Sequence, residues 1–551
     1  MGSTDTLAVP EHETRHQANN ASGKRGSAFW LTMLALIVST FLSALDLTAI
    51  GTALPTIVAD LNGGDDFSWA GSAYALSSTA VLPLSGSLAD IFGRRPVLLG
   101  AILFFALGSA LNGAAQSMNM LIAARTVQGI GGGAIITLTE IVISDLVPLA
   151  ERGTFQGVIG LVWALASGVG PPLGGVIAGA NWRWLFYMNL PLSGIALVLV
   201  WFFLSVRTPD GSMREKFARI DFMGNAIVIS GTTLAVVGLT FGGVRFPWSS
   251  VQVLAPLIIG LALIAGFMVY EAKIPREPTV PWVILSNRTT VGGYVSTFVH
   301  GLTSISIVYY IAIYFQAVLG ASSSRSGVNQ LALSLTIALF ALIAGVFTQV
   351  AQRYRPFIAV GWVFIIVGFG ITTLFKADST TAQWVGYQIV VAAGIGLIYT
   401  APVFPILAPL PVNRTAPALA FFAFVRAFAQ TWGITIAATV LQNALKAKLP
   451  AAFVAQFTGG VEIAYAAIPI IRDLPEPLRA QVRVAFAESM ATIWKVMTGI
   501  SALGVLSILL LKEVPMPTHK DDKYGLHANT EVNADEEKRE SRQASTTPSV
   551  F

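Results

Sequence analysis

The sequence predicts an all-α protein that crosses a membrane many times. Of its 551 residues, 54% are hydrophobic and only 11% are charged, whereas a soluble globular domain carries about 25% charged residues. Apolar runs of roughly 20 residues, the helix length that spans the hydrocarbon core, recur along the chain. The strict apolar and polar alternation of a membrane β-barrel is absent. Helices are therefore the expected spanning elements.

Fourteen apolar segments are expected to be transmembrane helices. In chain order they cover residues 29–52, 69–89, 96–115, 119–143, 156–179, 187–206, 220–241, 251–271, 290–314, 326–349, 357–375, 384–406, 417–440 and 491–511. The tails, 1–28 and 512–551, are polar and are expected to be disordered because they hold few large apolar residues. An even number of spans places both tails on the same side of the membrane.

Basic residues predict which side this is. Lys and Arg are concentrated in the tails and in alternate loops, for example at Arg94, Arg95, Arg152 and Arg207, whereas the other loops hold fewer of them. Cytoplasmic segments carry the excess of Lys and Arg in membrane proteins. Both termini are therefore expected in the cytoplasm.

The loop between the second and third predicted helices, GSLADIFGRRPVLLG, combines charge with flexible backbone. Gly86 and Gly93 allow helix ends to approach closely, and Asp90 can accept an ion pair at a helix end. Arg94 and Arg95 are expected at the depth of the lipid headgroups. These residues fit either a conformational gate or a simple topology anchor.

This loop resembles the signature that major facilitator superfamily transporters carry between their second and third spans. Other motifs resemble those of the fourteen-span drug:proton antiporter branch, in particular its fungal members. They are LDLTAIGTALPTI (45–57), RTVQGIGGGA (125–134), GVGPPLGG (168–175), NWRWLFYMNLP (181–191) and YFQAVLGASSSRSGV (314–328). The matches cover nearly all of the membrane domain. The resemblance implies the major facilitator fold, with two six-helix bundles and two extra spans.

The implied organisation divides the chain into three membrane regions. The N-terminal bundle occupies 29–206, the inserted spans seven and eight with their inner loops occupy 207–289, and the C-terminal bundle occupies 290–511. A long outer loop, 441–490, precedes the last span.

An internal repeat agrees with two related bundles. In GVFTQVAQRYRP, Gly345 and Arg353 repeat the spacing of Gly86 and Arg94. The position that corresponds to the aspartate of the first loop is Gln349. A gate based on a carboxylate is therefore expected only in the first half.

The fifth predicted span carries the motif that the family associates with exporters. Pro171 removes a backbone hydrogen bond, and Gly170, Gly174 and Gly175 permit close helix packing or a kink. The family often has a glycine at the position of Ala166, which is small enough to preserve the packing. The alternative is an ordinary helix distortion without a role in transport.

Charged residues inside predicted spans require a reason, because a charge at the bilayer centre costs about 2.5 to 3.5 kcal/mol on insertion scales. Asp46, Arg125, Glu140 and Arg426 are such residues. With the first span running outward and the fourth inward, Asp46 and Arg125 are expected to form a pair. The resemblance makes Arg125 a proton-coupling residue, with Asp46 and Glu140 as further candidates. The alternative for Asp46 is a fixed structural partner.

A charge cluster is expected where the fourth span ends. Asp145 and Arg152, in SDLVPLAERG, are expected to join Asp90 and Arg94 in stabilising one facing of the transporter. An ordinary solvated loop is the alternative. Glu140 alternatively faces the inner aqueous mouth or pairs with Arg152 or Arg94.

Several polar residues are candidates for the lining of a substrate cavity. His300, Tyr310, Tyr314 and Gln316 lie in the ninth span, and Arg426 lies in the thirteenth. An aromatic stripe at helical spacing and a single histidine can equally be packing residues.

The predicted function is secondary active transport and not enzymatic catalysis. The chain has no GxxxxGK[ST] phosphate loop, so ATP hydrolysis is not expected to supply the energy, and it has no cysteine and no intramembrane cluster of metal ligands. The resemblance implies the proton gradient as the energy source, and no cofactor or metal is expected. The expected partners are protons, a small-molecule substrate such as a drug, toxin or secondary metabolite, and the bilayer. No nucleic-acid partner is expected, and the transporter is expected to be a monomer.

The resemblance leaves three functions open. The favoured one is a proton antiporter that exports its substrate across the plasma membrane. The alternatives are a vacuolar basic amino acid/proton antiporter, since the SDLVP and ERG segments are similar in those relatives, and a sensor on the same fold that does not transport.

Overall fold

The computed structural model describes residues 26–517, apart from 62–66, 205, 207–210, 244–245, 455–467 and 469. Within these residues, fourteen helical segments are long and apolar enough to cross a bilayer. Helices suit this environment because they satisfy their backbone hydrogen bonds internally, where lipid offers no partner. The predicted all-α fold with fourteen spans is confirmed.

The first bundle contains six long helices. They are α2 (Ser27–Asp60), α3 (Phe67–Phe92), α4 (Arg94–Gly113), α5 (Met118–Leu146), α6 (Arg152–Asn181) and α8 (Asn189–Phe203), with the short α7 (Trp184–Tyr187) between the last two. Helix α5 packs against both α3 and α4, and α2 packs against α6 and α8. Most of α5 is buried, so its polar side chains must find partners inside the protein.

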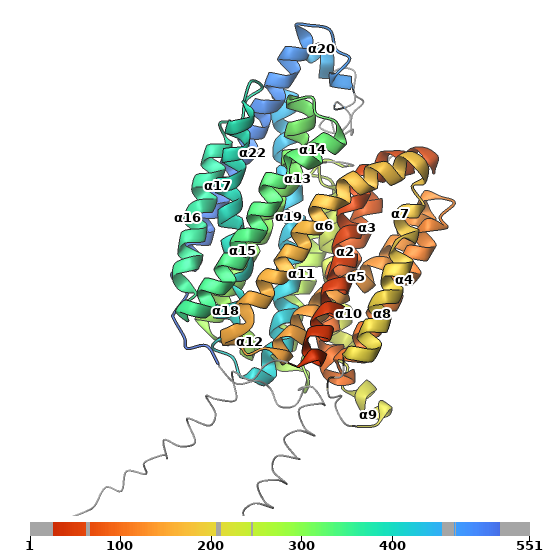
Figure 1. Ribbon diagram of the computed structural model, residues 1–551, viewed down its shortest axis with the longest axis vertical. Coiled ribbons are helices and arrows are strands. Elements are labelled where there is room, and N and C mark those ends of the chain that lie inside the picture. The colour runs from red at the N-terminus through yellow and green to blue at the C-terminus, as the bar shows by residue number, and fades with distance from the viewer. Residues whose placement is uncertain are drawn as a thin grey trace, which may run out of the picture.

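The second bundle is built in the same way. Its helices are α13 (Arg288–Ile313), α15 (Leu331–Ala351), α16 (Arg355–Thr372), α17 (Thr381–Thr400), α19 (Thr415–Lys448) and α22 (Leu478–Ser507), with the short elements α12 (Val283–Ser286), α14 (Ser323–Asn329), α18 (Val403–Leu407) and α20 (Ala451–Val454). The two bundles lie side by side (Figure 1). They meet mainly where α15 packs against α6 and where α19 packs against α3.

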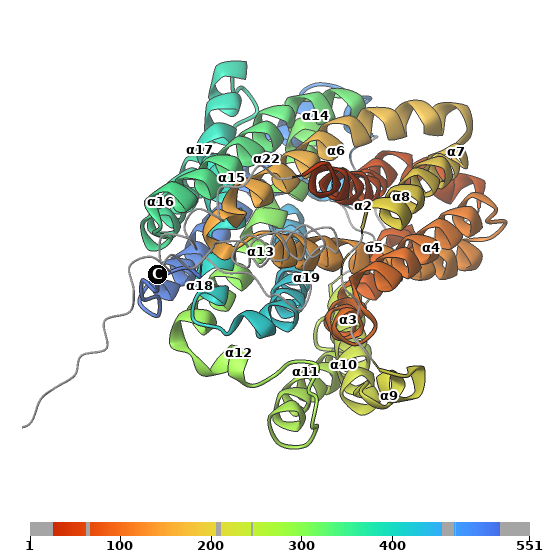
Figure 2. The same ribbon diagram turned by 60° about the horizontal axis from the view of Figure 1, so that its bottom comes forward.

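The inserted spans form a separate hairpin. Helices α10 (Phe222–Phe241) and α11 (Val251–Lys273) pack against each other, and α10 also contacts α3 and α19. The short α9 (Met213–Ala218) precedes them and begins with a capping box of Ser212 and Glu215. Figure 2 shows the hairpin at one edge of the molecule, outside both bundles.

The helices around the expected outer loop 441–490 are longer than the spans predicted on either side of it. Helix α19 continues to Lys448, and α22 begins at Leu478, well before the predicted start of the last span. Lys448 and Glu488 form an ion pair of 3.5 Å that connects the two extensions. The apolar run marks only the part of a helix that suits lipid, whereas the helix itself continues with polar side chains.

The two described chain ends lie at one face of the molecule, which we call the terminal face. Thr32 near the start of α2 donates a hydrogen bond to the carbonyl of Phe203 at the end of α8. At the other chain end, the backbone N–H of Ala150 donates to the carbonyl of Pro517. The loop between α3 and α4 lies at the same face (Figure 1).

Candidate functional site

An ion pair lies in the interior of the first bundle. Nη1 of Arg125 on α5 donates to Oδ2 of Asp46 on α2 at 2.6 Å, and both side chains are fully buried. The guanidinium also lies over the ring of Tyr74, with its Cζ 4.5 Å from the ring centroid. The structure therefore brings together the two residues that the sequence analysis paired.

Amide and hydroxyl groups complete this site. Gln128 and Asn189 donate to Oδ1 of Asp46 at 2.9 and 2.8 Å. The oxygen of Gln128 accepts from Arg125 at 2.7 Å and from Asn112 at 2.8 Å. These contacts hold the buried carboxylate with donors from two other helices, α5 and α8, so its position is fixed independently of solvent.

The sequence analysis did not identify Gln128, Asn189, Asn112 or Tyr74 as site residues. Gln128 lies three residues after Arg125, which places both on one face of α5. It belongs to the RTVQGIGGGA motif, and Asn189 belongs to NWRWLFYMNLP. The motifs contained the signal, but the contacts of these side chains could not be assigned without the fold.

The loop between α3 and α4 forms a compact ion cluster. Arg94 donates to Asp90 at 2.8 Å and to Asp145, at the end of α5, at 2.7 Å. Gly93 has a φ of 95°, which residues with a Cβ rarely adopt, and this turn directs the start of α4. Arg94 is only 2% exposed. Two carboxylates, Asp90 and Asp145, make this burial favourable.

The other two arginines of this region have different partners. Arg152 is buried and donates to the carbonyls of Ser144 and Val147, where α5 ends. Arg95 donates to the carbonyl of Trp201 and lies over its ring. Arg152 thus contributes to the charge cluster by holding the backbone next to Asp145, and not through a hydrogen bond to a carboxylate.

Small residues bring the two bundles together at the terminal face. A Cβ added to Gly86 on α3 would lie 2.4 Å from the Cβ of Ala420 on α19. A Cβ on Gly345 of α15 would lie 2.1 Å from the carbonyl oxygen of Gly153 on α6, and the reverse distance is 2.0 Å. Gly86 and its repeat Gly345 therefore occupy equivalent positions, each at a crossing between the two halves.

The repeated loop differs from the first one in its polar contacts. Gln349 accepts a hydrogen bond from Thr154 on α6 at 2.8 Å, and Gln352 donates to the carbonyl of Ala150 at 3.3 Å. Arg353 is exposed, in contrast to the buried arginine of the first loop. Neutral hydrogen bonds between the halves thus stand where the first loop has an ion cluster within one half.

The segment after α22 forms a strap, residues 512–517, across the terminal face. The N–H of Tyr354 donates to the carboxylate of Glu513 at 2.9 Å, and the N–H of Val514 donates to the hydroxyl of Tyr354 at 3.0 Å. Burial raises the pKa of Tyr354 to about 12, so its hydroxyl remains a donor to the carbonyl of Lys512 at neutral pH. The strap then reaches the first half, where Pro517 accepts from Ala150.

Little space remains between the halves at this face. A cavity of about 20 Å³ is lined by Ser144 and Arg152 of the first half, by Leu407 and Thr415 of the second, and by Pro517. That volume holds about one water molecule. Together with the close glycine crossings and the strap, this shows that the described residues of the two halves are in contact and closed at the terminal face.

A second ion pair connects the halves deeper in the molecule. Glu140 on α5 lies 3.9 Å from Nη1 of Arg426 on α19, and both side chains are mostly buried. Arg426 also donates to the carbonyl of Tyr399 at 2.8 Å and lies over the rings of Tyr399 and Phe422. Glu140 Oε2 and Arg426 Nε have no hydrogen-bond partner among the described residues. Glu140 thus pairs across the interface, and not with Arg152 or Arg94 as the sequence analysis considered.

The GVGPPLGG motif of the fifth span, residues 168–175, lies on α6 against α2. A Cβ on Gly170 would lie 2.2 Å from Oγ1 of Thr48, and that hydroxyl donates to the carbonyl of Ala166 at 3.0 Å. Gly174 is buried and Gly175 is half-buried. Helix α6 continues through Pro171 to Asn181. The motif therefore provides close packing between α6 and α2 in an unbroken helix.

The residues expected to line a cavity have mostly packing contacts. His300 is buried with its Nε2 3.0 Å from the carbonyl of Ile395. The hydroxyls of Tyr310 and Tyr314 donate to the carbonyls of Ile434 and Lys376. Gln316 lies in a short π-helix, Tyr314–Val318, that ends the ninth span. Of the five expected residues, Arg426 alone contacts the other half of the protein through an ion pair in the described structure.

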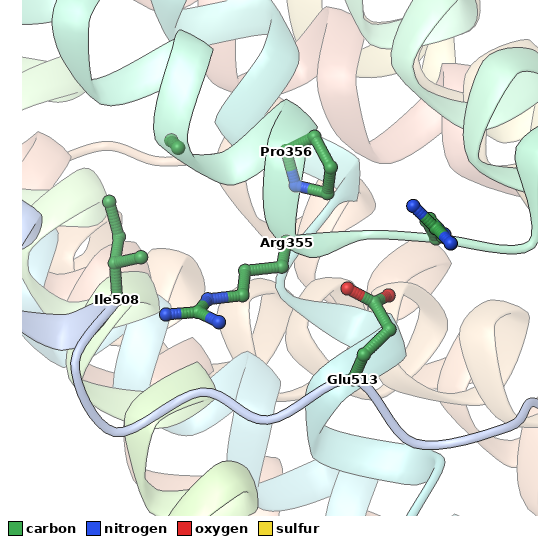
Figure 3. A pocket seen from close by; sticks show the side chains of 6 residues that line it. Arg355, Pro356, Ile508 and Glu513 are labelled. Atoms are coloured by element: carbon green, nitrogen blue, oxygen red, sulfur yellow. The ribbon is translucent and has the colours of Figure 1, made fainter.

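A larger cavity of about 520 Å³ lies away from the two buried ion pairs, Asp46 with Arg125 and Glu140 with Arg426. It is lined by Arg353, Arg355, Pro356, Ala359, Ile508 and Glu513, near the ends of α16 and α22 at the terminal face. Figure 3 shows the side chains of Arg355 and Glu513 at its wall. All of these residues belong to the second half, so this cavity is no passage between the bundles. In the part of the chain that the structure describes, no three His, Asp or Glu side chains gather as metal ligands.

The family profile of the Major Facilitator Superfamily matches residues 36–438. The chain belongs to the major facilitator superfamily. This superfamily member is 37% identical to "Efflux pump FUS6" of Gibberella fujikuroi, over 95% of its own length and 96% of the relative. It is 38% identical to the "Acurin A biosynthesis cluster MFS-type transporter" of Aspergillus aculeatus, over 94% of each chain.

A solved structure agrees with this assignment of the fold. The human organic anion transporter MFSD10 (TETRAN) aligns with this superfamily member at a TM-score of 0.55 and 15% identity, over 89% of this chain and 100% of the other. At that identity the likeness shows the shared major facilitator fold. The family match and the curated relatives identify the protein as a multi-pass membrane transporter of small compounds and not an enzyme.

Proposed function

We propose that this transporter is a monomeric proton-coupled antiporter that exports a small organic compound, such as a drug, toxin or secondary metabolite. The observation that carries the proposal is the fully buried ion pair of Asp46 and Arg125. A carboxylate enclosed in this way is a costly feature inside a membrane protein and marks a functional site. The printed names of the relatives, an efflux pump and a transporter of a biosynthesis cluster, support export.

Asp46 is the proposed proton carrier. In the present arrangement its two oxygens accept hydrogen bonds from Arg125, Gln128 and Asn189. A proton on Asp46 removes the charge that holds Arg125 and leaves fewer lone pairs for these donors. Helices α2, α5 and α8 must then adjust their contacts, so protonation and helix movement are linked in this bundle.

Helix α5 is the proposed connection between the proton site and the gate. It carries Arg125 of the buried pair, Glu140 of the pair between the halves, and Asp145 of the ion cluster at the terminal face. A displacement of this one helix changes all three sets of contacts. Release of Glu140 from Arg426 separates the halves, while a shift of Asp145 weakens the hold on Arg94.

The proposed orientation follows from the basic residues, which place both termini in the cytoplasm, and the proposed location is the plasma membrane. The terminal face is then the inner face, so the closed structure corresponds to the state that releases substrate to the outside. Inward proton flow supplies the energy, with about 2.3 kcal/mol per 100 mV for each charge that moves.

The test is efflux from proteoliposomes loaded with a panel of cationic, neutral and anionic fluorescent compounds. We expect an imposed proton gradient to drive transport of at least one compound by the wild type, and Asp46→Asn to abolish it. Asp60→Asn is the matched control, because Asp60 is on the same helix and its side chain is exposed. It should retain wild-type transport.

Two results would contradict the proposal. Efflux that does not respond to collapse of the proton gradient would exclude proton coupling. Gradient-driven efflux by Asp46→Asn at the wild-type rate would remove Asp46 from the role of carrier. Exchange of preloaded substrate without a gradient serves as the folding control, since it requires substrate binding and helix movement only.

A further inference from the structure

The inserted hairpin contains two carboxyl groups that face each other at the terminal face. Asp221 is the N-cap of α10, and its Oδ1 accepts from the N–H of Gly224 at 2.8 Å. Glu271 lies in the last turn of α11 and is only 4% exposed. The two carboxyl groups come together beside Gly224. This contact closes the open end of the hairpin.

The geometry around Gly224 shows how closely these groups converge. A Cβ at Gly224 would lie 2.1 Å from Oδ2 of Asp221 and 2.8 Å from Oε1 of Glu271. The two oxygens therefore occupy the space beside one glycine. Neither oxygen has a hydrogen-bond donor among the residues that the structure describes.

The remaining oxygens of both groups are already engaged. The hydroxyl of Tyr270 donates to Oδ1 of Asp221 at 3.1 Å, and the N–H of Val280 donates to Oε2 of Glu271 at 3.3 Å. The amide of Asn225, also 4% exposed, donates to Thr279 at 3.0 Å, while its own oxygen has no donor within the described residues. The cluster thus holds three buried oxygen atoms, on Asp221, Glu271 and Asn225, that have no donor among the described residues.

Three charged groups on the neighbouring elements have partners elsewhere, and Lys273 and Arg276 are exposed. Arg219, just before α10, donates to both oxygens of Glu277 at 3.0 and 2.7 Å. On α3, which packs against α10, Asp90 is paired with an arginine of its own loop. On α19, which also packs against α10, Arg426 pairs with the glutamate of α5. No cationic side chain in the described part of the chain forms an ion pair with Asp221 or Glu271.

We propose that Asp221 and Glu271 bind one proton between them, which gives the inserted hairpin a proton-binding site of its own. Two unscreened carboxylates at this distance repel each other, and a single shared proton converts the repulsion into a hydrogen bond. A metal ion fits less well, because Ca²⁺ takes six to eight oxygen ligands and only three side-chain oxygens lack donors here. The inference is independent of the proposed function of Asp46.

The proton also connects the hairpin to the second bundle. Asp221 begins α10, Glu271 ends α11, and Val280 lies in the segment that leads to α13. One hydrogen bond between the two carboxyl groups therefore ties both helices of the hairpin to this connection. Loss of the proton leaves two negative charges at the same point and loosens the terminal end of the hairpin.

The test uses the purified full-length protein in detergent, as wild type, Glu271→Gln and Asp221→Asn. We expect the infrared C=O band of a protonated carboxyl group at neutral pH in the wild type, and the loss of that band in both variants. We also expect the melting temperature of the wild type to fall from neutral to mildly alkaline pH. Glu271→Gln should flatten this profile, because an amide donates the same hydrogen bond without a titratable proton.

Glu277→Gln is the matched control, since Glu277 is an exposed carboxylate of the same region, paired with Arg219. It should retain both the infrared band and the slope of the wild type. If Glu271→Gln does not fold, Asp221→Asn provides the same comparison from the other side of the pair.

The proposal is overturned if both variants keep the band, or if they keep the wild-type pH profile. It is also overturned if Na⁺, compared with choline at equal ionic strength, stabilises the wild type and not Glu271→Gln.

Discussion

The crossing of Gly153 and Gly345 offers a direct way to shift the transporter between its two states. Replacement of Gly345 by alanine adds one methyl group at the point where α15 meets α6. That methyl would lie 2.1 Å from the carbonyl oxygen and 2.6 Å from the carbonyl carbon of Gly153. Both are backbone atoms of a long helix, so the contact cannot be relieved by rotation of a side chain.

The size of the effect follows from this geometry. The helices must separate by about 1 Å to restore a normal contact, and overpacking of this kind costs typically 1 to 3 kcal/mol. The strain arises only while the halves are in contact at the terminal face, whereas the gain in helix propensity from alanine is present in both states and cancels. At about 1.4 kcal/mol for each factor of ten, the population that is open at this face rises about 5- to 150-fold.

The chain lacks cysteine, so a single introduced thiol can report this change. Ser144 lines the small cavity between the halves and is 5% exposed. In Ser144→Cys, the rate of labelling by a water-soluble maleimide applied at the terminal face measures the open fraction while that fraction is small. We expect Gly345→Ala to raise the rate by about the same factor as the open population.

Gly179→Ala on α6 is the matched control, because nothing lies within 4 Å of a Cβ at that position. It adds the same methyl group to a helix that faces the same interface elsewhere. If Gly345→Ala labels no faster than Gly179→Ala, and both proteins have the same melting temperature, the crossing does not hold the terminal face closed. That result would refute the reasoning.

Three further predictions concern the charged and aromatic contacts. Asp90→Asn removes one of the two carboxylates that bind Arg94, whereas Gln349→Ala removes a neutral hydrogen bond. Asp90→Asn should therefore impair transport far more than Gln349→Ala in the proteoliposome efflux assay. Equal losses would contradict the asymmetry of the two loops. Arg426→Gln leaves Glu140 buried without its cation, which should lower the free energy of unfolding by about 3–5 kcal/mol, and addition of Glu140→Gln should restore most of it in thermal melts. Tyr354→Phe removes the hydroxyl contacts of the strap, and limited proteolysis should cut the strap several-fold faster than in the wild type.

Much of the fold could be predicted from the sequence because lipid imposes strong demands on it. A span needs a long apolar run and internal backbone hydrogen bonds, so the composition of each segment predicts whether it spans the membrane. Helix ends were less predictable. Helix α22 extends back to Leu478 through polar sequence. Polar side chains are tolerated both in water and at the ends of membrane helices, so they do not mark where the helix begins.

The paired charges within the first bundle were also accessible from sequence. The directions of the first and fourth spans place Asp46 and Arg125 at similar depth, and a buried charge requires an opposite charge nearby. The ion cluster of Asp90, Arg94 and Asp145 follows from the same reasoning at the ends of α3, α4 and α5. Each of these contacts joins helices of the same bundle.

Contacts between the halves could not be predicted in this way. The pairing of Glu140 with Arg426 depends on the rotation and register of α5 against α19. The sequence around either residue predicts neither of these. The same holds for Asp221 and Glu271, which lie at opposite ends of the hairpin sequence and look like ordinary charges beside a membrane. Packing decides which of these charges are buried.

Part of the contact that closes the terminal face is made by backbone groups alone. Gly153 meets Gly345 through backbone atoms, and Ala150 binds both the strap and Gln352 through its own backbone. Substitutions of other side chains do not alter these backbone groups. Related transporters can therefore change their substrate specificity through single substitutions of central side chains, while the backbone contacts at the terminal face are preserved.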